Sequence, residues 1–273
     1  MSWKSRVNDA LPETVRERRA SPPPRPADQP LAPGDRLLTA PAFVLSSVRS
    51  GSTLLRVLLN THSQIHAPHE LHLRNIWVKT RHHNTEWALH EMDLDPNQLT
   101  YLLWDRILQR QLERSGKRIL VNKTPSDVFI ADRIRECWPD ARFVFLLRHP
   151  LAIVRSREKI GSEDLDDNVR RVLRYCSAVQ AARERFPGLT VRYEVLASDP
   201  AAETQRLCEF LGVDWEPGML DYGAGEHGQY RRGIGDFSEK LKSGQVQRPA
   251  PPAGEVPEPL RGIAAAWGYP PAT

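Results

Sequence analysis

Apolar residues along the chain follow two different spacings. Four short runs are compact and rich in β-branched or aromatic residues, as buried strands are, and they cover residues 42–45, 118–121, 142–147 and 189–193. Elsewhere apolar residues recur every three or four positions, which indicates amphipathic helices over residues 53–60, 97–113, 126–138, 151–159, 165–186 and 201–211. This alternation predicts an α/β fold with a parallel sheet, whose ligands bind outside the carboxyl ends of the strands.

Two stretches, residues 21–41 and 248–259, are too rich in proline to be packed elements. We therefore expect residues 1–40 to form a flexible arm, residues 41–248 the main domain, and residues 249–273 a tail. Ile263 and Trp267 in the tail are four positions apart, a spacing that suits the docking of one helical turn on the domain.

The composition narrows the class of ligand. With 38 basic and 34 acidic residues the net charge is +4, which suits an anionic small molecule better than a nucleic acid. Cys137, Cys176 and Cys208 lack the spacing of a disulfide framework or a thiolate metal site. The N-terminus lacks the apolar core of a signal peptide, and no apolar run is long enough to span a bilayer. We expect a cytoplasmic protein without a membrane span.

A short polar loop joins the first predicted strand to the first predicted helix, and it reads Ser46-Ser47-Val48-Arg49-Ser50-Gly51-Ser52-Thr53. Its last three backbone amides would converge at the helix N-terminus, where unpaired N–H groups and the helix dipole favour an anion. Gly51 allows close approach of a ligand, and Ser52 and Thr53 add hydroxyl donors. The Walker A pattern is absent, which argues against an ATPase. An ordinary strand-to-helix turn is the competing interpretation.

The run Arg49-Ser50-Gly51-Ser52-Thr53-Leu54-Leu55-Arg56 resembles the 5′-phosphosulfate loop of sulfotransferases that use 3′-phosphoadenosine 5′-phosphosulfate (PAPS). Downstream, the strand at 142–147 runs into Arg148-His149-Pro150, and Ser156 follows eight positions after Arg148, similar to the 3′-phosphate motif of that family. The motifs are closest to the tyrosylprotein and carbohydrate branch. The resemblance implies a P-loop-like three-layer fold with a central parallel sheet flanked by helices. It also implies PAPS binding by these residues: Arg49, Ser50, Gly51, Ser52, Thr53, Arg148 and Ser156.

Two weaker resemblances extend the nucleotide site. Tyr193 lies in a segment similar to one whose aromatic residue is near the adenine in relatives, although it can equally be a packing residue. Ser243 and Arg248 lie in a stretch similar to a late loop that closes over the nucleotide, and a solvated basic loop is the alternative.

Sulfuryl transfer to a hydroxyl needs a base and positive charge at the transferring group. In relatives a glutamate about twenty residues after the loop arginine often serves as the base, which points to Glu70 here. His69 and His72 stay open as alternatives, because histidine is the base in the cytosolic relatives. Lys123 resembles a lysine that stabilises the transferring oxygens, and Arg49 shares that role.

The histidines of this region also have a spacing that metal ligands can adopt on a helix, at positions 62, 66, 69 and 72. Pro68 interrupts such a helix, and sulfotransferases of this kind need no metal. We expect no metal cofactor.

The predicted function is transfer of a sulfuryl group from PAPS to a hydroxyl of an unidentified small-molecule, glycan or peptide acceptor, with release of 3′-phosphoadenosine 5′-phosphate (PAP). Residues 73–116 match no motif, and by elimination they are expected to shape the acceptor pocket with the aromatic residues Trp77, Trp87, Tyr101 and Trp104. Two alternatives remain: an atypical P-loop nucleotide kinase, and a catalytically inactive nucleotide-binding or interaction module that recruits a partner through its proline-rich arms.

Overall fold

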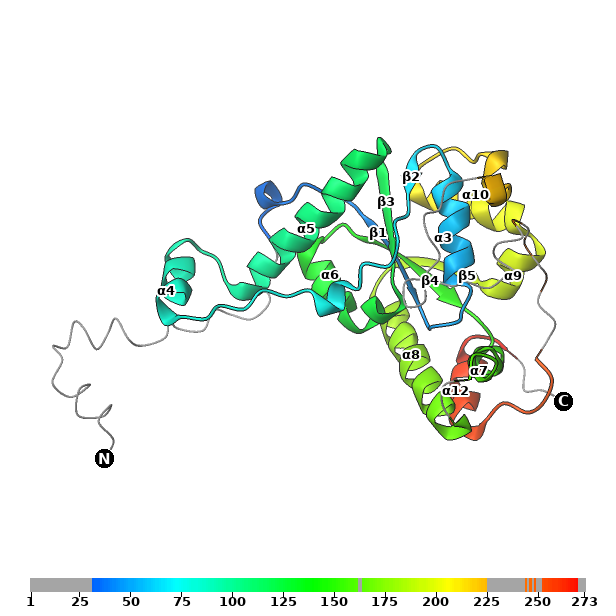
Figure 1. The fold of residues 1–273 in the computed structure, drawn as a ribbon. Helices are drawn as coiled ribbons and strands as arrows, with labels where there is room; N and C mark the ends of the chain where they lie inside the picture. Colours follow the sequence, from blue (N-terminus) through cyan, green and yellow to red (C-terminus); the bar gives the residue numbers. More distant parts are fainter. Residues whose placement is uncertain are drawn as a thin grey trace, which may run out of the picture.

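A parallel sheet forms the centre of the computed structural model, which describes residues 31–161, 164–224, 244, 246, 248 and 252–269. Within these residues the sheet has five strands in the order β2-β3-β1-β4-β5, and every neighbouring pair is parallel (Figure 1). The strands are β1 (Ala42–Ser46), β2 (Ile65–His66), β3 (Ile119–Lys123), β4 (Arg142–Leu147) and β5 (Gly188–Arg192). The predicted α/β class with a parallel sheet is therefore confirmed.

Helices cover both faces of this sheet (Figure 1). The α-helices are α3 (Ser52–Thr61), α4 (His83–Glu91), α5 (Pro96–Ser115), α6 (Ala131–Cys137), α7 (Pro150–Glu158), α8 (Leu165–Arg185), α9 (Tyr193–Ser198), α10 (Pro200–Leu211) and α12 (Glu258–Ala266). Short 3₁₀ helices lie at η1 (Pro33–Asp35), η2 (Leu73–Asn75), η3 (Pro125–Ile130), η4 (Pro217–Leu220) and η5 (Tyr222–Ala224).

Successive residues of each strand point to opposite faces, so the strands divide two apolar cores. Phe43 and Leu45 of β1 belong to the core that includes residues of α5, α6, α8 and α12. Ala42 and Val44 belong to the core that includes residues of α3 and α10. Because both faces are buried, the strands are continuously apolar rather than alternating with polar residues, and this is what made β1 and β4 recognisable in the sequence.

Several elements differ from those expected from the sequence, for physical reasons. β2 has two residues and is too short to show a period. α4 buries none of its residues, so it lacks an apolar stripe. The helix expected over 126–138 starts as the 3₁₀ helix η3 and becomes α-helical at Ala131. Pro125 begins η3, and the side chain of Asp127 is turned inward to a hydrogen bond with Asn122.

Both segments outside the predicted domain have described residues that contact its core. Leu31 and Leu38, from the segment assigned to the arm, are buried, and the main-chain N–H groups of Leu37 and Leu38 donate to the Asp105 carboxylate at 2.7 and 3.1 Å. In the tail, α12 packs against α8 and α7 (Figure 1). Trp267, just after α12, is 1% exposed.

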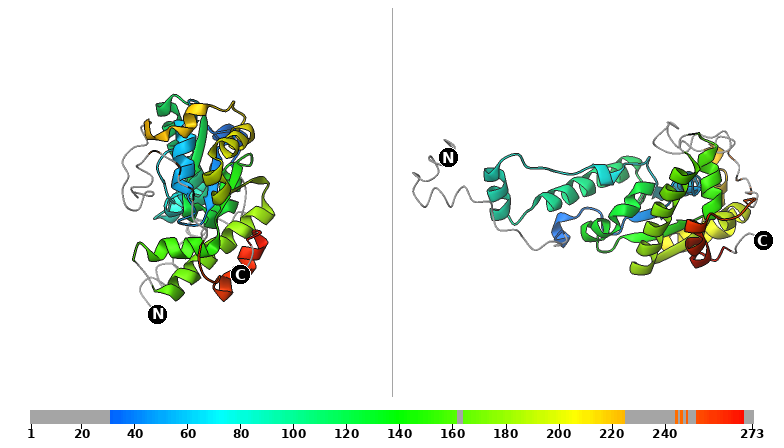
Figure 2. Two further views of the ribbon diagram at one scale, coloured as in Figure 1. Left: turned by 90° about the vertical axis from the view of Figure 1, so that its right-hand side faces the viewer. Right: turned by 90° about the horizontal axis from the view of Figure 1, so that it is seen from below.

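The segment that the sequence left without a motif is divided between core and surface. Tyr101 and Trp104 of α5 are buried core residues, 2% and 0% exposed, so they are unsuited to line an acceptor pocket. Trp77 is 62% exposed, and α4 extends away from the sheet in both Figure 1 and the right-hand view of Figure 2. Among the described helices, none combines the length and apolarity that a bilayer crossing requires.

Candidate active site

The polar residues predicted for the site follow strands that end at one edge of the sheet. β1 lies between β3 and β4, so the strands that follow it in sequence are added on both of its sides. The strand order therefore reverses at β1, and α/β folds bind ligands at the carboxyl ends of the strands at such a topological switch point. Arg49 follows β1, Lys123 ends β3, Arg148 follows β4 and Tyr193 follows β5. The fold thus gathers residues that are up to about 150 positions apart in sequence.

The loop between β1 and α3 has the backbone of an anion-binding turn. Gly51, the residue preceding α3, has φ +85°, and Arg49 has φ +60°, both in the left-handed region. Ser52 and Thr53 form the first turn of α3, whose main-chain N–H groups lack helical acceptors. The Ser50 hydroxyl is buried and has no hydrogen-bond partner among the described residues. The loop thus brings the buried Ser50 hydroxyl to a helix N-terminus, where main-chain N–H groups and the helix dipole favour an anion.

The Arg148 side of the site is bonded directly to this loop. Arg148 Nη1 donates to the carbonyl oxygen of Arg49 at 2.7 Å, and Arg49 Nε donates to the Ser156 hydroxyl at 3.2 Å. Burial lowers the pKa of the Arg148 guanidinium. Its Nε is buried without an acceptor in the described part of the chain, as expected for a donor reserved for an anionic ligand.

Tyr193 lies between the two parts of this arrangement. The Arg148 guanidinium is 4.5 Å from the centre of the Tyr193 ring. A Cβ atom on Gly51 would approach Tyr193 Cδ2 to 2.2 Å, so the ring also lies against the β1–α3 loop. Tyr193 therefore fixes the distance between Gly51 and Arg148, whereas its expected place beside an adenine stays a prediction.

This packing makes Gly51 sensitive to a single added methyl group. We expect Gly51→Ala to lower the free energy of unfolding by about 3 kcal/mol, because it adds overpacking against Tyr193 to the strain of a left-handed alanine. Gly116→Ala is the matched control, since Gly116 has φ +66° but no atom within 4 Å of the added carbon. Gly116→Ala should lower the free energy of unfolding, measured by urea denaturation, by only about 1 kcal/mol. Equal costs for the two variants would contradict the close contact with Tyr193.

Glu70 and Lys123 form an ion pair beside these loops. Lys123 Nζ donates to Glu70 Oε1, and the lysine side chain is fully buried while that of Glu70 is 10% exposed. His72 Nε2 lies 3.6 Å from Glu70 Oε2, and His72 Nδ1 lies 3.5 Å from the Ser126 hydroxyl. The structure thus places a carboxylate, a buried cation and an imidazole together, which is a set able to move a proton and to stabilise developing negative charge.

Comparison with known proteins identifies the family. The model of the sulfotransferase family matches residues 41–217, which include β1 to β5 and all of these loops. The chain belongs to the sulfotransferase family. Protein-tyrosine sulfotransferase A of Caenorhabditis elegans is 26% identical over 204 residues, which make up 67% of this chain and 53% of that protein. Nodulation protein NoeE of Sinorhizobium fredii is 26% identical over 234 residues, 72% of this chain and 55% of NoeE. This sulfotransferase spans about half the length of these curated relatives.

Solved structures share the fold. The sulfotransferase domain from the Synechococcus PCC 7002 olefin synthase has a TM-score of 0.63 at 23% identity, covering 86% of this chain and 98% of that domain. The sulfotransferase domain from the curacin biosynthetic pathway has a TM-score of 0.60 at 21% identity, covering 85% and 99%. At these identities the likeness concerns the fold, and it confirms the predicted P-loop-like three-layer arrangement.

A buried carboxyl group lies next to the ion pair of this sulfotransferase. Asp127, in η3, is 1% exposed, and Asn122 Nδ2 donates to its Oδ2 at 2.9 Å. Burial raises the pKa of Asp127 to about 7, and the nearby Glu70 charge adds to the rise, while hydrogen bonds from the Arg74 main chain and the Asn122 side chain oppose it. No motif marks Asp127 in the sequence. The one sequence feature that links Asp127 to the site is its position, four residues after Lys123.

Because folding raises the pKa of Asp127, the protein binds a proton at this residue between about pH 4 and pH 7 that the unfolded chain does not. This contribution to stability is complete below the unfolded pKa and is lost as the pH rises toward 7. We expect the free energy of unfolding of the wild type to fall by on the order of 2 kcal/mol more than that of Asp127→Asn between pH 5 and pH 8. Urea denaturation at the two pH values measures the difference, and parallel pH profiles would contradict the raised pKa.

The remaining predicted site residues, Ser243 and Arg248, are not brought to the loops described above by any contact of the described residues. Ser243 lies outside the described residues. Arg248 is exposed, and its Nη2 donates to the carbonyl oxygen of Ser198, at the end of α9, at 3.3 Å. The four histidines considered as metal ligands do not share a helix, since His62 follows α3, His66 belongs to β2 and His72 precedes η2. Among the described residues there is no group of three side chains suited to a metal ion.

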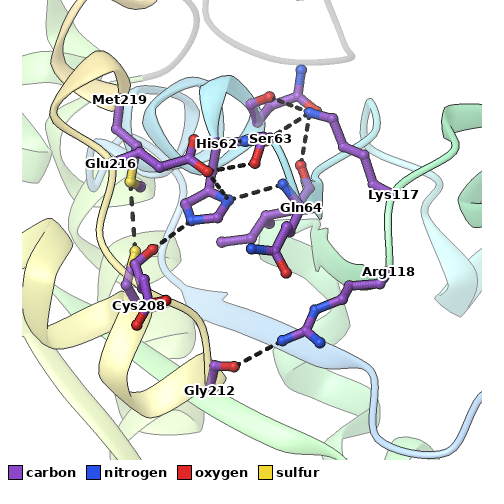
Figure 3. Close-up of polar contacts among 12 residues, drawn as sticks. His62, Ser63, Gln64, Lys117, Arg118, Cys208, Gly212, Glu216 and Met219 are labelled. Atoms are coloured by element: carbon purple, nitrogen blue, oxygen red, sulfur yellow. Dashed lines mark hydrogen bonds and ion pairs between the residues drawn. The ribbon is translucent and has the colours of Figure 1, made fainter.

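A second polar cluster lies at the opposite edge of the sheet, near the start of β3 (Figure 3). Lys117 Nζ donates to the carbonyl oxygens of Asn60, His62 and Ile65 at 2.7, 2.9 and 3.0 Å, so it caps the C-terminal end of α3. His62 Nε2 donates to the Asp214 carbonyl oxygen at 2.8 Å, and Glu216 accepts hydrogen bonds from Ser63. These groups satisfy one another, which explains the cluster as structural support for α3.

Proposed function

We propose that this sulfotransferase transfers a sulfuryl group from PAPS to an acceptor hydroxyl and releases PAP. The observation that carries the proposal is the hydrogen-bonded pair of anion-binding turns, in which Arg148 bonds the Arg49 carbonyl oxygen while its own Nε stays available. A ligand with two separated phosphate groups suits two linked turns. The β1–α3 loop would take the 5′-phosphosulfate, and Arg148 with Ser156 the 3′-phosphate.

The chemical step uses the pair beside these turns. Glu70 accepts the proton of the acceptor hydroxyl as the acceptor oxygen forms its bond to sulfur, and the bond between sulfur and the 5′-phosphate oxygen breaks. Lys123 supplies positive charge to the oxygens that become negative. Since Lys123 donates a hydrogen bond to Glu70 in this structure, the same contact orients the carboxylate and places the lysine charge beside it.

The names of the relatives suggest which chemical classes of acceptor to propose. One relative is named a protein-tyrosine sulfotransferase and another a nodulation protein, so tyrosine peptides and other hydroxyl compounds are the first acceptors to test.

Ligand-dependent melting separates this function from its alternatives. We expect PAP to raise the melting temperature while ATP does not, because ATP lacks the 3′-phosphate that Arg148 binds. Equal stabilisation by ATP would favour a nucleotide kinase, and stabilisation by neither would overturn nucleotide binding. A screen with labelled PAPS across phenol, sugar, peptide and lipid acceptors then tests catalysis, and PAP binding without transfer to any of them would favour an inactive nucleotide-binding module.

A further inference from the structure

Glu194, the second residue of α9, joins two distant parts of the chain through its two carboxylate oxygens. Oε1 accepts a hydrogen bond from the main-chain N–H of His149 at 3.0 Å. Oε2 accepts a hydrogen bond from the Tyr269 hydroxyl, beyond α12 in the C-terminal segment, at 2.6 Å. His149 directly follows Arg148, so the carboxylate holds the backbone of the turn that presents the guanidinium.

The same turn is fixed at three neighbouring points. His149 Nδ1 accepts a hydrogen bond from the main-chain N–H of Leu151, which caps α7. The Arg148 guanidinium lies over the ring of Tyr193, the residue immediately before Glu194. One corner of the fold, where β5 becomes α9, therefore holds Arg148 by its side chain through Tyr193 and by its backbone through Glu194.

Tyr269 is buried against the residues where β5 becomes α9 and against the Arg148 turn. The residue is 8% exposed, and its ring lies 4.9 Å from the His149 ring and 5.3 Å from the Arg192 guanidinium, measured to ring centres. Burial and the Glu194 carboxylate raise the pKa of the Tyr269 hydroxyl, so the group keeps its proton and remains a donor. A carboxylate that is bonded to both a main-chain N–H and a buried hydroxyl is strongly oriented.

The C-terminal segment carrying Tyr269 is anchored to the domain at further points. Arg192 Nη2 donates to the carbonyl oxygen of Trp267 at 2.5 Å, and Trp267 Nε1 donates to Gln180 Oε1, on α8, at 2.8 Å. The segment thus reaches α8, the end of β5 and the Arg148 turn together. The Tyr269 hydroxyl is therefore held by contacts of this segment with α8 and the end of β5 as well as with the Arg148 turn.

We propose that Glu194 and Tyr269 are positioning residues for the Arg148–Pro150 turn, which makes the C-terminal segment a working part of the donor-nucleotide site. Their role is to set the direction of the Arg148 guanidinium and so the preference for a nucleotide that carries a 3′-phosphate. The proposal rests on the proposed function, in which Arg148 binds that phosphate.

The test compares the dissociation constants of PAP and adenosine 5′-phosphate (AMP), which lacks the 3′-phosphate, by calorimetric titration. Glu194→Gln leaves one acceptor oxygen for two donors, and we expect it to weaken PAP binding about tenfold while AMP binding is unchanged. Tyr269→Phe keeps the buried ring and removes only the donor, with an expected loss for PAP of about threefold to fivefold. Glu255→Gln, an 86% exposed carboxylate ahead of α12, is the matched control and should change neither constant.

Arg148→Ala calibrates the experiment and separates the two proposals. If it lowers the preference for PAP over AMP while Glu194→Gln and Tyr269→Phe keep the wild-type preference, the positioning role is wrong and the function stands. If Arg148→Ala also keeps the preference, the 3′-phosphate assignment itself fails. Equal weakening of PAP and AMP would show a general structural role and would overturn the proposal. Tyr269→Phe decides the matter alone where Glu194→Gln does not fold.

Discussion

Glu70→Gln is expected to lower the rate of sulfuryl transfer by about a hundredfold or more, the usual contribution of a general base, while PAP binding stays near the wild-type value. Glutamine has nearly the shape of glutamate and keeps an oxygen that can accept the hydrogen bond from Lys123. It cannot take a proton from an acceptor hydroxyl. The loss should therefore appear in the turnover number measured with labelled PAPS, whereas titration with PAP should show little change.

The change also leaves the fully buried Lys123 without a carboxylate, so part of any loss could come from stability. The PAP-induced rise in melting temperature, measured on both proteins, separates a folded but inactive site from a damaged one. Glu113→Gln, an exposed carboxylate on α5, is the matched control and should be fully active. Near-normal turnover by Glu70→Gln would move the role to His69 or His72, and of these His72 lies 3.6 Å from the Glu70 carboxylate. Changing each histidine to asparagine would then identify the base.

The sheet was predictable where strands are buried on both faces. β1 and β4 are central strands, and their continuously apolar residues gave bounds that match the structure to within one residue. β2 is a two-residue edge strand, and its pairing with β3 depends on partners more than fifty positions away. α4 has no apolar stripe because it buries none of its residues. Elements that form through distant contacts, or without a buried face, leave little trace in local periodicity.

The site was predictable where one residue type is required at a fixed place after a strand. Arg49 lies three positions after β1 and Arg148 follows β4 directly, so the strand pattern and the motif located them together. Glu194 and Tyr269 had no such signal, since their hydrogen bond spans 75 positions. Such a pair is visible only when the tail is folded onto the domain, although the spacing of Ile263 and Trp267 did indicate that the tail could dock.

Arg148→Ala is expected to weaken PAP binding by about a hundredfold, because a buried guanidinium bonded to a phosphate is worth more than an exposed ion pair. Burial already lowers the pKa of this group, so the protein holds a partly desolvated cation whose Nε lacks an acceptor among the described residues. A phosphate would supply both the charge and the acceptor. AMP binding should change much less, since AMP has no 3′-phosphate to contact the Arg148 guanidinium.

The interpretation of that result depends on a second role of the same side chain. Arg148 Nη1 also bonds the Arg49 carbonyl oxygen, so its removal loosens the β1–α3 loop. Arg148→Lys distinguishes the roles, because lysine keeps the charge but lacks the planar fork that serves the Arg49 carbonyl oxygen and a phosphate at once. We expect it to recover part of the PAP affinity lost in Arg148→Ala. Arg155→Ala, a 50% exposed arginine on α7, is the control and should bind PAP normally. Unchanged PAP affinity in Arg148→Ala would remove the 3′-phosphate from this turn, and with it the reason to read the two linked turns as a site for PAPS.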